Sequence, residues 1–239
     1  MNATSTLNFT LMTRFAMVTC ISLLSVGCRA PVKESAPQPA APMQGDISGA
    51  TVYKIDGAAS DVHILVYKGG AMARLGHNHV LSSKEVHGAL YLQSNLSNSM
   101  FELTLPVASL QVDDPAARAR EGEDFAAEVP QDARDGTRRN LIRPDVLDLE
   151  HYPTISLRSM SVSGTRAAPT LTVRVSLKGT ARDVIVPTKM VEAGKQLTVT
   201  GEFKIKQTEF GMTPFSVALG ALQVLDELRV KFSIVCRQQ

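Results

Sequence analysis

Two histidines in the stretch Gly76-His77-Asn78-His79 are the closest pair of side chains with clear chemical potential in the sequence. Alternate residues of an extended strand point to the same face, which would place His77 and His79 about 6–7 Å apart. Two imidazoles at that spacing can ligate one zinc or copper ion. They can equally hydrogen-bond the polar head group of a ligand. His77 and His79 are therefore candidates for either role.

The remaining ligands of a metal site are not fixed by the sequence. The nearby candidates are His63, His87, Glu85 and Asp61. A two-residue turn at Gly69-Gly70 would put His63 on the opposite face from His77, and a three-residue loop would reverse this. We therefore expect no metal cofactor, with His77 and His79 as the metal candidates if one is bound.

Motifs for covalent catalysis are absent from the sequence. It contains no Gly-x-Ser-x-Gly elbow and no His-Glu-x-x-His helix. Cys236 stands alone on an apolar segment, which is typical of an inert core thiol. We expect a protein that is not an enzyme.

A group of arginines follows in a charged region. Arg134 and Arg138 are four residues apart, so a helix would place them on one face, with Arg139 and Arg143 close by. Arg138 and Arg139 are candidates for contact with a ligand head group, and surface ion pairing with neighbouring acids is the alternative.

Composition restricts the class of protein. The chain has 239 residues, of which 44% are hydrophobic, and its net charge is +2. No uniform field therefore favours nucleic acid. Three cysteines cannot form a disulfide framework. The sequence leaves the oligomeric state open, a homodimer included.

The N-terminus is typical of an exported bacterial protein. Arg14 precedes a short apolar run ending in Leu24-Ser25-Val26-Gly27-Cys28, which resembles a lipoprotein signal with Cys28 as the acylated residue. A simple secreted protein is the alternative. We expect a signal peptide over 1–27 and a Pro- and Ala-rich tether over 28–50. We expect a protein anchored in the bacterial periplasm, and Arg29 favours the outer membrane over the inner membrane as the site of the anchor.

Residues 51–239 alternate apolar and polar side chains with a period of two. The segments Leu171–Leu177 and Leu228–Ile234 are examples. About eight such strands predict a mainly β fold, either an antiparallel barrel or a sandwich. The charged region 113–150 breaks the pattern and predicts a short helical insertion capping the barrel, with Asp113 or Asp114 as N-cap.

Several motifs resemble the YceI-like family in order and spacing. They are Tyr53-Lys54-Ile55-Asp56, the block RRNLIRPDVLDLEHYPTISLRS, Gly179-Thr180 with Arg182, GEFKIKQTEFGM and LDELRVKFSIVC. The resemblance implies a lipocalin-like barrel in a periplasmic or secreted protein. It also implies binding of a polyisoprenoid, such as a quinone tail, inside the barrel.

The side chains expected to line such a cavity lie on one face of the predicted strands. They are Val62, Ile64, Val66, Leu90, Leu92, Leu103, Leu105, Val173, Val175, Phe203, Ile205 and Phe232. The leading hypothesis is a membrane-anchored protein that binds a lipid or polyisoprenoid. The alternatives are a metal-binding or enzymatic protein using His77 and His79, and an interaction protein with a filled barrel.

Overall fold

The structure is a computed structural model that describes residues 46–239. The expected signal peptide over 1–27, the acylation site Cys28 and nearly all of the tether over 28–50 lie outside these residues. None of the helices between residues 46 and 239 has the length and apolar character needed to cross a bilayer.

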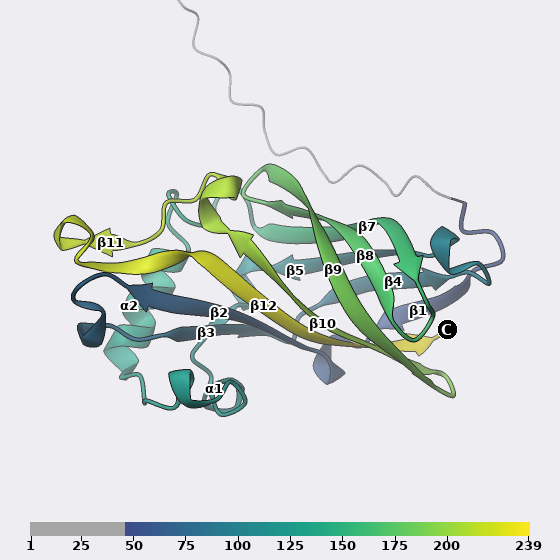
Figure 1. Ribbon diagram of the computed structural model, residues 1–239, viewed down its shortest axis with the longest axis horizontal. Helices are drawn as coiled ribbons and strands as arrows, with labels where there is room; N and C mark the ends of the chain where they lie inside the picture. Colours follow the sequence, from purple (N-terminus) through teal and green to yellow (C-terminus); the bar gives the residue numbers. More distant parts are fainter. Residues whose placement is uncertain (1–45) are drawn as a thin grey trace, which may run out of the picture. The chain divides into compact units, whose positions relative to one another are not determined.

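Eight antiparallel strands close into a barrel, as the alternating pattern and the resemblance predicted (Figure 1). Strand β1 pairs with β12 and closes the ring, with Ile55 opposite Cys236. In order round the wall, the strands are β1 (Thr51–Ile55), β4 (His87–Leu92), β5 (Met100–Pro106), β7 (Thr154–Gly164), β8 (Pro169–Leu177), β9 (Thr180–Ala193), β10 (Gln196–Lys206) and β12 (Leu222–Gln238).

Further strands extend the sheet beyond the ring. Strand β12 pairs with β2 (Asp61–Gly69), β2 with β3 (His79–Ser83), and β3 with β6 (Gln111–Val112). The short β11 (Ser216–Val217) pairs with the start of β12. Single turns of 3-10 helix occupy Gly57–Ala59, Ala73–Leu75, Leu96–Asn98, Val107–Ser109, Glu123–Phe125, Gln207–Phe210 and Ala218–Gly220.

Tight turns join the long hairpins where the sequence has glycine. Lys178 and Gly179 both have positive φ between β8 and β9, which is the conformation of a two-residue turn that suits twisted strands. The connection between β2 and β3 is longer than a two- or three-residue turn, because residues 70–78 contain a 3-10 turn. His63 consequently pairs with Ser82, and Val66 pairs with His79.

The charged region forms two helices, α1 (Pro115–Arg118) and α2 (Gln131–Leu141), as expected for the helical insertion. Asp114 is the N-cap of α1 and accepts a hydrogen bond from the Ala117 amide. Residues 115–125, which comprise α1 and the following 3-10 turn and are called the α1 segment, lie against the outer face of β2 and β3. There Phe125 packs edge-on to Tyr67. Helix α2 contacts β6.

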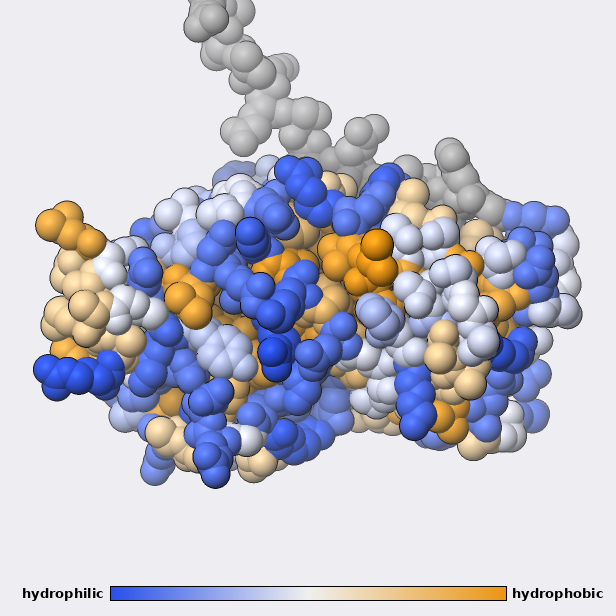
Figure 2. Space-filling model, in the orientation of Figure 1, coloured by the Kyte–Doolittle hydropathy of each residue, from blue (hydrophilic) through white to orange (hydrophobic). Residues whose placement is uncertain are grey.

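Burial follows the period of the strands. One face of each barrel strand packs inward into a single apolar core that includes Leu105, Val173, Val199 and Leu228. Figure 2 shows that hydrophilic side chains cover much of the visible outer surface, with apolar residues in smaller patches between them. The sequence therefore produces a barrel with an apolar interior.

Candidate functional site

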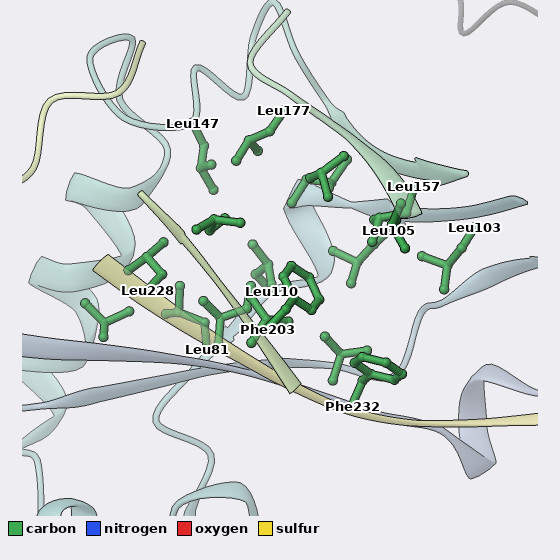
Figure 3. Close-up of a pocket in the computed structure, with 18 of the residues that line it drawn as sticks. Leu81, Leu103, Leu105, Leu110, Leu147, Leu157, Leu177, Phe203, Leu228 and Phe232 are labelled. Atoms are coloured by element: carbon green, nitrogen blue, oxygen red, sulfur yellow. The ribbon is translucent and has the colours of Figure 1, made fainter. Parts of the chain in front are cut away.

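The barrel interior contains an apolar cavity of about 300 Å³. Its volume lies at the lower end of the range for small-molecule sites. Aliphatic, phenylalanine and methionine side chains form almost the entire lining, and the exceptions are His79, Thr137, Asn140, Gln207 and Cys236. Figure 3 shows lining side chains from different strands converging on this space. The barrel is therefore not fully packed.

Most of the side chains predicted from the strand pattern line this cavity. They are Val62, Ile64, Val66, Leu90, Leu103, Leu105, Val173, Val175, Phe203, Ile205 and Phe232. Leu92 does not, although it is buried in the surrounding core, because it lies at the end of β4 beyond Leu90. Their contact with a ligand stays a prediction.

Residues outside the predicted lining also line the cavity. Helix α2 contributes Thr137, Asn140 and Leu141, and the following segment contributes Val146 and Leu147. The helical insertion therefore forms part of the cavity wall, because it folds back over the barrel interior. The signal in the sequence was the break in the strand pattern over 113–150, which predicted a helical insertion capping the barrel.

Of the four polar candidates, His79 lines the cavity and the other three are not among its lining residues. The guanidinium of Arg138 donates to the carbonyl oxygens of Ala108 and Leu110 at 3.0 and 2.9 Å, which fixes it to the backbone. Arg139 is exposed. His77 lies just before the start of β3, and the centroid of its ring is 6.2 Å from that of the His79 ring.

A buried carboxylate orients His79. Asp113 Oδ2 lies 2.6 Å from His79 Nδ1, and Asp113 Oδ1 accepts hydrogen bonds from Arg118 Nη1 at 2.5 Å and the Val80 amide at 2.9 Å. Burial alone would raise the pKa of Asp113, but its hydrogen bonds with His79, the Val80 amide and the Arg118 guanidinium hold that pKa below its ordinary value. Asp113 is therefore ionised at neutral pH.

A second buried ionic cluster lies on the outer face of the same sheet. Glu121 Oε1 is 2.5 Å from His63 Nδ1, and its Oε2 is 2.6 Å from Lys231 Nζ. Burial would raise the pKa of Glu121, but its hydrogen bonds with His63 and Lys231 hold the pKa below its ordinary value. This cluster fastens the α1 segment to the barrel wall and does not face the cavity.

The predicted metal candidates do not gain further ligands in the structure. Among residues 46–239, no group of three or more His, Cys, Asp or Glu side chains is placed to hold a metal ion. His79 Nδ1 is engaged by Asp113. His63 lies on the opposite face of the sheet from His79, because it alternates with the inward-facing Val62 and Ile64 on β2.

Cys236 is a thiol that faces the cavity. It is 1% exposed and lines the apolar interior from β12. Burial raises the pKa of its thiol to about 12, so the nucleophilic thiolate is scarce at neutral pH. The side chain therefore behaves as an apolar part of the wall, in agreement with its place on an apolar strand.

The closed antiparallel barrel with an apolar cavity defines a lipocalin-like β-barrel. The chain belongs to the YceI-like domain family, whose model matches residues 53–236. This agrees with the resemblance in the sequence motifs. A search of curated proteins found no match.

Two solved structures share the fold. BcnA from Burkholderia cenocepacia has a TM-score of 0.56 and 18% identity, covering 76% of this chain and 98% of BcnA. A polyisoprenoid binding domain from Saccharophagus degradans, implicated in plant cell wall breakdown, has a TM-score of 0.50 and 12% identity, covering 79% of this chain and 99% of that domain. At these identities the matches establish the architecture alone.

Proposed function

We propose that this protein binds a lipid or polyisoprenoid molecule inside the barrel and that it acts as a carrier or sequestering protein and not as an enzyme. The observation that carries the proposal is the apolar cavity of about 300 Å³ in the closed barrel. Burial of an apolar chain there contributes about 25 cal/mol per Å² removed from water. Family membership and the polyisoprenoid binding domain from Saccharophagus degradans support this class of ligand.

The cavity wall allows a direct test with one inward and one outward substitution. Val173 on β8 is buried and lines the cavity, whereas Ile185 on β9 is 69% exposed. Val173→Trp adds an indole to the cavity, and Ile185→Trp adds the same group to the surface. Circular dichroism of both variants checks that the barrel still folds.

The measurement is native mass spectrometry of the full chain purified from a bacterial envelope, followed by solvent extraction and identification of the extract. We expect about one apolar ligand per chain in the wild type and in Ile185→Trp, and little or none in Val173→Trp. A wild-type protein that carries no ligand, and binds no prenyl compound after solvent extraction, would refute the proposed function.

We further propose that the protein is anchored in the bacterial envelope through acylated Cys28, more specifically at the outer membrane. The support is the lipoprotein-like sequence before Cys28 and Arg29 after it. The intact mass of the purified protein tests this, because acylation adds the mass of the lipid to a chain beginning at Cys28. A Cys28→Ala variant should lose that mass and leave the membrane fraction, and an unmodified wild-type chain would contradict the proposal.

A further inference from the structure

The cavity has one polar position where the ligand class can be specified further. His79 Nε2 lies 3.3 Å from Thr137 Oγ1, and both residues line the cavity. Asn140 lines it too and lies one helical turn after Thr137. His79 is the first residue of β3 and Thr137 lies on α2, so this polar position lies where the helical insertion meets the barrel wall.

The Asp113 carboxylate fixes which ring nitrogen of His79 carries the proton. An ionised carboxylate only accepts hydrogen bonds, so His79 Nδ1 must donate to Asp113 Oδ2 across their 2.6 Å separation. In the neutral imidazole, Nε2 is then a lone-pair acceptor. Asp113 thereby sets the hydrogen-bonding character that His79 presents to the cavity.

The charge of Asp113 is already balanced by an arginine. Arg118 already neutralises Asp113 through a contact of 2.5 Å, and both side chains are at least nine-tenths buried. His79 is held by Asp113 through Nδ1 and presents Nε2 to Thr137 at the cavity wall.

We propose that His79 and Thr137 bind the hydroxyl head group of an isoprenoid alcohol or prenylated phenol. This inference rests on the proposed function. The ligand hydroxyl donates its hydrogen to His79 Nε2, and its oxygen accepts from the Thr137 hydroxyl, which can rotate because its present contact is long at 3.3 Å. A carbonyl head group can only accept, so the single Thr137 hydrogen would serve either the carbonyl or His79 Nε2, and the other acceptor would lack a donor.

A phosphorylated head group does not fit this position. The guanidinium of Arg118 is engaged by Asp113 and by the carbonyl oxygens of Asn78, Phe125 and Ala127. The guanidinium of Arg138 is bonded to backbone carbonyls. Neither of these two guanidinium groups is therefore free to bind a phosphate near His79, and burial of an unpaired phosphate is costly.

The test compares three probes that share one prenyl chain. Isothermal titration calorimetry measures binding of farnesol, farnesyl methyl ether and farnesyl phosphate to the full chain after solvent extraction. The ether keeps the oxygen and removes the donated hydrogen. We expect farnesol to bind about tenfold more tightly than the ether, as for one buried hydrogen bond, and more tightly still than the phosphate.

Three variants assign the preference to its residues. His79→Phe removes the acceptor and should reduce the ratio of ether to farnesol dissociation constants to about one. Thr137→Val keeps the Asp113 contacts intact and should weaken farnesol binding, which decides the case if His79→Phe does not fold. His77→Phe is the matched control, because His77 does not line the cavity, and it should keep the wild-type ratio.

The outcomes separate this inference from the proposed function. Binding of all three probes with equal affinity, or tighter binding of the phosphate, would overturn the hydroxyl site while leaving prenyl binding in place. The same conclusion follows if the preference for farnesol over the ether survives His79→Phe, or if Thr137→Val does not weaken farnesol binding. If none of the probes binds to the wild type, the proposed function fails and this inference fails with it.

Discussion

Replacement of Asp113 by asparagine should destabilise the fold strongly, because this buried carboxylate has three partners. It accepts hydrogen bonds from Arg118, His79 and the Val80 amide, and its side chain is fully buried. Removing one partner of a buried ion pair costs about 3–5 kcal/mol, because the other charge is left uncompensated. Asparagine tolerates the positive φ of 55° at this position, so backbone strain adds little.

Urea unfolding followed by circular dichroism measures this loss. With an m-value of about 1–3 kcal/mol/M, a loss of about 3–5 kcal/mol lowers the unfolding midpoint by roughly 1–5 M. The matched control is Asp183→Asn, because Asp183 also binds one arginine, Arg174, at 2.7 and 2.8 Å, but is 40% exposed. The control should lose about 0–1 kcal/mol. Equal, small shifts in both variants would refute our reading of the buried network.

Three further expectations concern backbone conformation, pH and the buried thiol. Gly194→Ala should lower the free energy of unfolding by about 1–2 kcal/mol for its positive φ alone. Gly88→Ala should lower it clearly more, because the new Cβ would stand 2.1 Å from the Glu102 carbonyl oxygen, and the urea midpoints of the two variants check this order. Because the pKa of Glu121 is lowered in the folded state, its contribution to stability is complete above the unfolded-state pKa of 4.5 and is lost as the pH falls through the lower folded-state pKa. The difference in unfolding free energy between wild type and Glu121→Gln should therefore narrow only in acid. The Cys236 thiol, with a pKa of about 12, should react with a disulfide reagent at pH 8 only after unfolding, and labelling followed by peptide mapping would show any reaction in the native state.

The barrel and much of its lining were predictable because the side-chain period of a strand is local information. Val173 and Val175 alternate with polar neighbours within a single segment, so the inward face follows without knowledge of the rest of the chain. Leu92 lies on the same face of its strand but is buried in the core without lining the cavity. The strand pattern could not predict this, because it does not show how far along each strand the cavity extends.

The polar site was only partly predictable because it depends on contacts distant in sequence. Asp113 lies 34 residues from His79, and no local period connects them. The adjacent pair Asp113-Asp114 gave a signal, since only one of the two can cap the helix and the other is free for a different role. Thr137 reaches His79 only because α2 folds over the barrel, which a solvated surface insertion would not do.

The long strand β12 also determines when the protein can fold during synthesis. It pairs with β10 along most of its length, with β2, and with β1, the first strand of the barrel. A ribosome must therefore finish residues 222–238 before the wall can close, and until then the apolar lining has no enclosed space. Such pairing over long sequence separations slows folding and exposes apolar surface in incomplete chains. Closure of the cavity therefore waits for the pairing of β12 with β1.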